Sequence, residues 1–324
     1  MKALVCEAWG LPETLVVRDL ADPQAGPGQA VVRVHAAGVN FPDALIIQNK
    51  YQFTPPLPFV PGSEAAGVVE SVGEGVSQVA PGDRVMALTG SGAFAEKVQA
   101  VAAALTPLPE GVDFATGAAL ILSYGTAYHA LAGRGALQRG ETLLVLGAAG
   151  GVGLAAVEIG KALGARVIAA ASSEQKRRIC REHGADEVLD YATADLKSTL
   201  ATLTAGAGAD VIFDPVGGAF TEAALRSCAW RGRHLVIGFA NGDIPRVPAN
   251  LLLLKGCSLI GVFWGRYLKS EPAAWARDLA VLLGWLREGR LRPHIGGRYS
   301  LERGAQALSA LLARKACGKL VITP

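Results

Sequence analysis

The sequence has 324 residues and a formal net charge of +3; 51% of the residues are hydrophobic and 18% are charged. This composition is typical of a globular chain with a large core and excludes an intrinsically disordered one. The lysines and arginines are dispersed, so the charge provides no footprint for a nucleic acid. The longest apolar runs, such as 118–122 and 251–254, are too short to cross a bilayer.

The N-terminus and the cysteines indicate the compartment. Glu7 comes too early for the apolar core of a secretory signal. Five cysteines are scattered singly without a Cys-x-x-Cys pair, which favours neither a zinc lobe nor a disulfide framework. We therefore expect a reduced, cytoplasmic compartment and no membrane partner.

Residues 1 to about 120 read as short strands separated by turns rich in proline and glycine. We expect strands at 2–5, 15–19, 30–37, 67–72, 84–88 and 93–98. Short strands separated by such turns favour a small, strongly bent β-barrel. Residues 112–132 then change to a helical pattern.

From residue 142 strands alternate with helices. The expected strands are 142–146, 166–170, 187–189, 210–213, 234–237 and 258–262, and a helix is expected at 173–183. Six strands joined by crossovers predict a doubly wound parallel sheet. The tail adds helices near 273–287 and 301–314 and a strand at 319–322. We expect the tail to return to the first domain, so that the second domain is an insertion.

A glycine-rich turn follows the first strand of the second region. The run from Gly147 to Gly153 reads Gly-Ala-Ala-Gly-Gly-Val-Gly, between an apolar strand and a helix. Gly147 suits the tight turn, Gly150 and Gly151 allow a pyrophosphate to approach the backbone, and Gly153 allows close helix packing. The first N–H groups of the helix favour negative charge. The turn predicts a dinucleotide site; the alternative is a tight loop of any α/β protein.

The end of the second strand bears on the choice between NADPH and NADH. NAD-selective folds place an acid about 20 residues beyond the turn to hold the ribose hydroxyls. Here the strand is followed by Ser172 and Ser173, and then by Lys176 in the next helix. Hydroxyls and a cation suit a 2′-phosphate, which favours NADPH. The alternatives are that Glu174 selects NADH, or that the basic residues are a solvated helix face.

Several further stretches match a known family nearly end to end. They are AGVNFPD at 37–43, PGSEAAG at 61–67, PGDRV at 81–85, the turn at 148–153, GFA at 238–240, NLLLLK at 250–255 and GVFWG at 261–265. On these the chain resembles the zinc-independent quinone oxidoreductase (zeta-crystallin-like) branch of the medium-chain dehydrogenase/reductase superfamily. The resemblance implies a GroES-like β-barrel catalytic domain with an inserted Rossmann domain, an NADPH cofactor and usually a homodimer. We place the catalytic domain at 1–122 and 264–324 and the NADPH-binding domain at 123–263.

Metal chemistry divides this superfamily. Zinc members carry a Cys near position 37 and a Gly-His-Glu near position 62, where this chain has Ala37 and Ser63. Neither side chain is a zinc ligand comparable to thiolate or imidazole. Asp43 and Glu64 remain, but two carboxylates without soft ligands make no zinc site, and we expect them to be structural. The sequence therefore predicts no metal, and reduction of an electrophilic acceptor in preference to alcohol oxidation.

The resemblance also implies individual site residues. Lys176, Tyr191 and Arg314 would contact the adenosine phosphate; Tyr191 could instead pack at a strand end, and Arg314 could be an exposed helix terminus. Asn40 and Tyr51 are the catalytic candidates beside the nicotinamide, because an amide can donate to a ribose or substrate oxygen and a phenol can supply a proton. Their alternatives are a turn residue and a pocket wall.

The resemblance further implies that Thr126, Phe239, Phe263 and Trp264 surround the nicotinamide ring, although the aromatic ones could otherwise be core residues. The complete expected set is Asn40, Thr126, Ala149, Gly150, Gly151, Val152, Ser172, Ser173, Lys176, Tyr191, Phe239, Phe263, Trp264 and Arg314.

These features predict an NADPH-dependent oxidoreductase that transfers a hydride to a quinone without zinc. An alternative acceptor is the C=C bond of an α,β-unsaturated carbonyl or enoyl thioester. A different class is an NADPH-binding structural or RNA-binding protein. The expected strand 258–262 is apolar and last in the sheet, which favours a homodimer and leaves a tetramer open.

Overall fold

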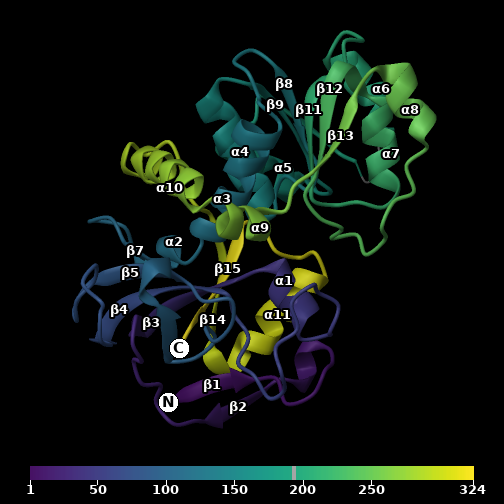
Figure 1. The fold of residues 1–324 in the computed structure, drawn as a ribbon. Helices are drawn as coiled ribbons and strands as arrows, with labels where there is room; N and C mark the ends of the chain where they lie inside the picture. Colours follow the sequence, from purple (N-terminus) through teal and green to yellow (C-terminus); the bar gives the residue numbers. More distant parts are fainter. Residues whose placement is uncertain (192–194) are drawn as a thin grey trace. The chain divides into compact units, whose positions relative to one another are not determined.

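The computed structural model describes residues 1–191 and 195–324. The chain forms two compact units, one of residues 1–122 with 293–324 and one of residues 123–292 (Figure 1). The second unit is thus inserted into the first, as the sequence suggested, but the insertion ends at 292 and not at 263.

The segment after residue 263 stays with the second unit because its aromatic side chains pack there. The rings of Trp264 and Trp275 meet edge to face at 5.3 Å, and Tyr267 stacks on His129 at 3.9 Å. A Cβ on Gly125 would lie 2.7 Å from the Trp264 ring, so this indole lies directly on α3 (Ile121–Tyr128). The sequence of residues 264–292 did not indicate which rings these aromatic side chains would meet.

The first unit is built on a seven-stranded sheet. Its order is β14 (Ile295–Ser300), β15 (Lys319–Thr323), β3 (Gln29–Val39), β4 (Glu64–Val72), β5 (Arg84–Leu88) and β7 (Leu105–Pro107), with β6 (Lys97–Val101) also paired to β3. Two irregularities in the pairing of β3 with β4 let these strands bend. A separate pair joins β1 (Lys2–Val5) to β2 (Val16–Asp19).

Short helical segments cover this sheet. They are η1 (Pro12–Thr14), α1 (Phe41–Ile46), η2 (Ala102–Ala104), α2 (Phe114–Gly117), η4 (Leu301–Arg303) and α11 (Gly304–Leu312). The strand expected at 93–98 begins later, at Lys97. Phe94 and Ala95 are instead held by isolated contacts: Phe94 O accepts from Leu4 N at 2.9 Å, Phe94 N donates to Pro61 O at 3.0 Å, and Ala95 forms an isolated bridge to Ala3.

The second unit contains a six-stranded parallel sheet, which confirms the predicted Rossmann arrangement. The order is β10 (Glu187–Leu189), β9 (Arg166–Ala170), β8 (Thr142–Val145), β11 (Ala209–Asp214), β12 (Cys228–Val236) and β13 (Ser258–Gly261). The strand order changes direction at β8, where doubly wound sheets bind their ligands. β12 begins at residue 228 and not at 234, because Cys228 already pairs with Ala209 of β11; after a bulge, regular pairing resumes with Arg233 opposite Val211.

Helices cover both faces of this sheet (Figure 1). On one face α4 (Gly151–Leu163) brings Gly160 against Leu143 and Val167, whereas Leu144 and Ile168 face the cluster that includes Leu200 of α6. The helices of the unit, in chain order, are α3, η3 (His129–Arg134), α4, α5 (Glu174–Glu182), α6 (Leu196–Leu203), α7 (Ala219–Arg226), α8 (Ala249–Lys255), α9 (Trp264–Ser270) and α10 (Pro272–Arg287). Among the described residues, none of the helices is long and apolar enough to cross a membrane.

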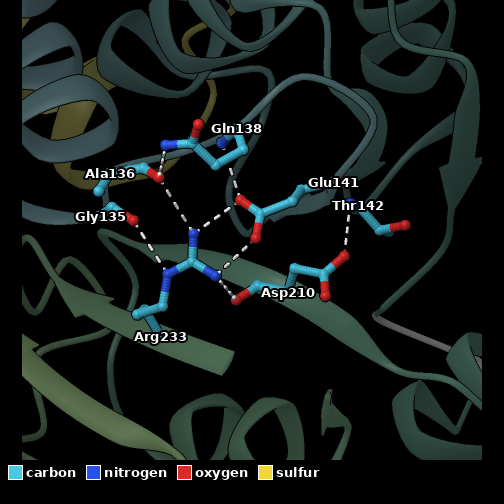
Figure 2. Close-up of polar contacts among 7 residues, drawn as sticks. All are labelled: Gly135, Ala136, Gln138, Glu141, Thr142, Asp210 and Arg233. Carbon is cyan, nitrogen blue, oxygen red and sulfur yellow. Dashed lines mark hydrogen bonds and ion pairs between the residues drawn. The ribbon is translucent and has the colours of Figure 1, made fainter. Parts of the chain in front are cut away.

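A charged network closes the amino-terminal edge of β8, β11 and β12 (Figure 2). Arg233 donates to both carboxylate oxygens of Glu141, at 2.9 and 2.7 Å, and from Nε to Gly135 O at 2.9 Å. Beside it, Asp210 Oδ2 accepts from Thr142 N at 2.8 Å. The loop before β8 is therefore fixed to two neighbouring strands.

Candidate functional site

The glycine turn lies at the carboxyl end of β8, on the opposite edge of the same sheet. Gly147 has φ +57°, the left-handed conformation that favours glycine. A Cβ on Gly153 would lie 2.3 Å from Gly147 O, so only glycine lets α4 approach the strand end this closely. A Cβ on Gly150 would meet only Gly147 O, at 3.4 Å. The backbone is open at Gly150, and this fits a pyrophosphate at the start of α4.

The serines after β9 lie at the start of α5. Ser173 is the N-cap, and its Oγ accepts from Lys176 N at 3.4 Å. A hydroxyl that accepts one bond can still donate its own hydrogen, so Ser173 keeps a donor for a phosphate oxygen. Ser172 is exposed and Lys176 is half-buried on the same turn. These three polar groups suit a 2′-phosphate.

Glu174, the sequence-based alternative that would select NADH, is neutralised within its own helix. Its carboxylate lies 3.1 Å from Arg177 Nη2 and 2.9 Å from Arg181 Nη1. The hydrogen bonds from Arg181 and Arg177 hold the pKa of Glu174 below its usual range. Arg177 also pairs with Asp190 at 2.6 Å. Glu174 is thus engaged by two arginines, and Arg177 is poorly placed to substitute for Lys176.

The expected aromatic contacts fall at three places in the second unit. Tyr191 meets Phe220 edge to face at 4.8 Å, so it does pack at a strand end. Phe239 lies against the turn after β11, where a Cβ on Gly217 would be 2.9 Å from its ring. Phe263 is 56% exposed just before α9.

Thr126 and Trp264 are brought together through α3. Thr126 is half-buried on this helix, one residue beyond the glycine that accommodates the Trp264 ring. Trp264 is 7% exposed, and its indole Nε1 has no hydrogen-bond partner within the described part of the chain. An unsatisfied buried donor of this kind is available to a ligand oxygen. Arg314 belongs to the first unit, exposed directly after α11 with φ +57°.

The catalytic candidate Asn40 belongs to a buried polar group in the first unit that we call the lysine cluster: Asn40, Asp43, Ser63, Glu64 and Lys319. Lys319 Nζ donates to Asn40 Oδ1 at 2.5 Å and to Glu64 Oε2 at 3.1 Å. Ser63 Oγ donates to Asp43 Oδ1 at 3.1 Å, and Asn40 N donates to Asp43 Oδ2 at 2.8 Å. The cluster ties β3, α1, β4 and β15 together.

The amide of Asn40 is already occupied in this cluster. Its Nδ2 donates to Gly38 O and to Glu64 Oε2, both at 3.2 Å, and only 5% of the residue is exposed. An amide nitrogen has two hydrogens, so donation to a substrate would break one of these bonds. The geometry therefore favours Asn40 as a residue that orders the loop before α1 over a direct hydrogen-bond donor.

Asp43 and Tyr51 have shifted acidities. Complete burial raises the pKa of Asp43 to about 7, against the opposing bonds from Asn40 N and Ser63 and the charge of Lys319. Burial also raises the pKa of Tyr51, and the negative charge of Asp43 adds to this effect. Tyr51 thus stays a neutral phenol across the physiological range and keeps its proton, but the raised pKa makes it a weaker acid than an ordinary tyrosine.

Lys319 is the member of the cluster that sequence reasoning missed. A single lysine beginning an apolar strand looks like an ordinary edge residue, yet it is 4% exposed. Its ammonium balances Glu64, while Ala37 lies in the sheet opposite Ala65 and Ile322. In the part of the chain that the structure describes, no group of three or more His, Cys, Asp or Glu side chains could hold a metal ion.

A glycine turn at the switch point of a parallel sheet, inserted into a bent β-sheet unit, defines the class of two-domain dinucleotide-dependent dehydrogenases and reductases. Family models agree: "Alcohol dehydrogenase GroES-like domain" matches residues 26–110 and "Zinc-binding dehydrogenase" matches residues 151–282.

Known proteins specify the branch. A "Quinone oxidoreductase-like protein 2 homolog" of Nematostella vectensis is 40% identical over 99% of this chain and 88% of its own length. The human "Quinone oxidoreductase" is 35% identical over 99% and 97%. The Escherichia coli quinone oxidoreductase complexed with NADPH superposes with a TM-score of 0.94, at 28% identity and full coverage of both chains. The chain belongs to the zinc-independent quinone oxidoreductase branch of the medium-chain dehydrogenase/reductase superfamily, and it is an NADPH-dependent oxidoreductase.

Proposed function

We propose that this oxidoreductase reduces a quinone by hydride transfer from NADPH, without a metal. The observation that carries the proposal is the lysine cluster. Its carboxylates are held by Lys319 and Ser63, in a family where a metal would need the same carboxylates and soft ligands. A quinone is electrophilic enough to accept a hydride without Lewis-acid activation. The names of the relatives point the same way.

The residues of the chain would bind and orient the reactants, while bound NADPH supplies the hydride at nicotinamide C4. The open backbone at Gly150 would hold the pyrophosphate, and Ser172, Ser173 and Lys176 would hold the 2′-phosphate. Tyr51 would give a proton to the reduced acceptor, and the lysine cluster would order the loop before α1. The proposed cofactor contacts comprise Asn40, Thr126, Ala149, Gly150, Gly151, Val152, Ser172, Ser173, Lys176, Tyr191, Phe239, Phe263, Trp264 and Arg314.

The acceptor is tested by stopped-flow NADPH oxidation against benzoquinones, naphthoquinones, alkenals and enoyl thioesters. Quinones should give the highest kcat/KM, with activity unchanged by chelators and no stoichiometric zinc by elemental analysis. A clear preference for alkenals or enoyl thioesters would transfer the assignment to C=C reduction. One zinc per chain, with activity lost on its removal, would contradict the metal-free mechanism.

We also propose a homodimer in the cytoplasm. Among the strands that the structure describes, β13 pairs with β12 alone, and Leu259 on this edge strand is 37% exposed. Leu253 and Leu254 on the preceding helix are 80% and 72% exposed. Edges of this kind pair with a copy of themselves about a two-fold axis. Light scattering at micromolar concentration should give twice the chain mass, and a monomer would remove the idea. The unbridged thiols favour a reducing compartment.

A further inference from the structure

Two cysteines of the second unit, Cys228 and Cys257, lie against each other away from the glycine turn. Cys228 begins β12, and Cys257 comes directly before β13. Cys257 packs against the hydrophobic cluster that contains Cys228. Both are free thiols. The parallel pairing of Arg233 with Ser258 brings their neighbourhoods together, which the spacing of 29 positions in sequence did not reveal.

The local backbone holds both thiols in place. Arg231 has φ +62° in the bulged part of β12 that follows Cys228, and a Cβ on Gly232 would lie 2.5 Å from the Cys228 sulfur. The residue before Cys257 is Gly256, with φ +57°, where a Cβ would lie 2.6 Å from the Trp230 ring. The Cys228 sulfur therefore takes up the side-chain position of Gly232. Gly232 and Cys257 each directly precede the paired residues Arg233 and Ser258, so the two cysteines lie at the same level of neighbouring strands.

The pair is accessible to a small oxidant. Cys257 is half-buried, and Cys228 lines a cavity of about 430 Å³ together with Lys197, Arg226 and Lys255. Burial raises the pKa of the Cys228 thiol, and contact with Cys257 adds to this, whereas Lys255 and Arg233 act in the opposite direction. Cys257 is the more exposed of the two and is therefore the first to react, with Cys228 as its resolving partner.

We propose that Cys228 and Cys257 form a disulfide when the protein meets hydrogen peroxide, which makes them a redox-sensitive modification site. The Cys257 thiolate attacks one peroxide oxygen, the O–O bond breaks, and the leaving hydroxide takes up a proton as water. The Cys228 thiol then attacks the sulfenic sulfur and loses its proton as the S–O bond breaks and a second water leaves. Two thiols are oxidised to one disulfide, and one peroxide is reduced to two waters.

The bond would link the start of β12 to the segment entering β13 and enclose α8 in a covalent loop. A cross-link between residues that are distant in sequence restricts the unfolded chain and stabilises the folded one. Oxidation should therefore raise Tm by a few degrees, and dithiothreitol should reverse the shift. The edge strand proposed for dimer contact, β13, begins directly after Cys257.

The test treats the full-length protein with hydrogen peroxide, alkylates the remaining thiols after denaturation, and analyses tryptic peptides without reduction. Peptide 227–231 should appear linked to peptide 256–266, two hydrogens lighter than their sum. C257S and C228S should each abolish the linked species. C317S should keep it, since Cys317 is also half-buried but has no role in the pair.

Several results would overturn the proposal. The first is that both peptides carry the alkylating reagent after peroxide treatment. Another is that Cys257 is recovered as sulfinic acid while Cys228 stays alkylatable. Linkage of either cysteine to Cys6, Cys180 or Cys317 would also contradict it. These readouts are taken on the wild-type protein, so they stand even where a serine variant folds poorly.

Discussion

The two edges of the parallel sheet in the second unit differ in whether their polar groups are paired within the protein. At the amino-terminal edge, Arg233 and Glu141 neutralise each other, and Asp210 binds a backbone N–H (Figure 2). At the carboxyl edge, Gly147 makes the tight turn with φ +57° and Gly150 leaves the backbone open. The first edge satisfies its own polar groups and contributes stability, whereas the second leaves donors for an external anion.

Substitutions of Gly150 and Gly153 at the carboxyl edge should give the largest effects, and together they distinguish a loss of cofactor binding from a loss of stability. Gly150→Ala should lower kcat/KM for NADPH and NADH alike, by about a hundredfold, because the methyl group would take the space proposed for the pyrophosphate. Its φ of −76° accepts alanine, so Tm should stay near the wild-type value. Steady-state kinetics with one quinone and a thermal melt measure both.

The matched variant Gly153→Ala should behave differently. Its Cβ would lie 2.3 Å from Gly147 O, so α4 must move and Tm should fall together with cofactor binding. A Gly150→Ala protein with a low Tm, or with unchanged NADPH kinetics, would contradict the open-backbone interpretation.

Lys176→Ala should damage NADPH use and leave NADH use nearly untouched. A charge-assisted contact with the 2′-phosphate is worth roughly 1.5–3 kcal/mol, which corresponds to a loss of about ten- to a hundredfold in kcat/KM for NADPH. Uniform binding would place the loss in KM. Arg177 is held by Glu174 and Asp190, so compensation would have to come from Ser172 or Ser173.

Arg178→Ala is the control on the same helix, because this exposed side chain lies 3.6 Å from Glu182 in a surface pair. It should change kcat/KM for either cofactor by less than about twofold. Equal losses for NADPH and NADH in the Lys176 variant would mean that Lys176 supports the fold.

The amino-terminal edge should affect stability and leave the cofactor kinetics unchanged. Glu141→Gln removes one charge from a half-buried pair and should lower the free energy of unfolding by about 1–3 kcal/mol, with KM for NADPH unaltered. Chemical denaturation and kinetics on one preparation measure both. A changed KM would show that the two edges are coupled.

The same pair predicts a pH dependence. Burial acts to raise the pKa of Glu141, but the bonds from Arg233 and Gln138 N outweigh it and hold the pKa below its usual range. A lowered folded-state pKa gives stability that is present above the unfolded pKa and lost as pH falls through the folded one. The difference in stability between wild type and Glu141→Gln should therefore shrink in acid below the usual carboxyl range. A constant difference across that range would contradict this.

Local signals explain what the sequence could predict. The strands of the Rossmann sheet and the role of Gly153 follow from apolar runs and from a turn that only glycine can form. Lys319 could not be predicted, because its partner Asn40 lies 279 positions away in sequence and the contact depends on strand pairing. The end of the insertion at residue 292 was missed for a similar reason, since Trp264 and Tyr267 are defined by the rings that they meet.

The geometry supports the predicted roles of Asn40 and of the serines after β9 to different extents. Asn40 was identified as a donor from its place in the motif, and only the structure shows its amide engaged by Gly38 and Glu64. The position of the serines after β9 followed once the end of that strand was located, and Ser173 is indeed at the start of α5.

The most direct test of the account is the cofactor preference of the wild-type protein with a single quinone. Stopped-flow oxidation of NADPH and of NADH by 1,4-benzoquinone, in chelator-treated buffer, gives kcat/KM for each. NADPH should be preferred by about tenfold or more, because Lys176 and two serine hydroxyls would bind the 2′-phosphate while Glu174 is engaged by two arginines. Equal or better use of NADH would contradict it.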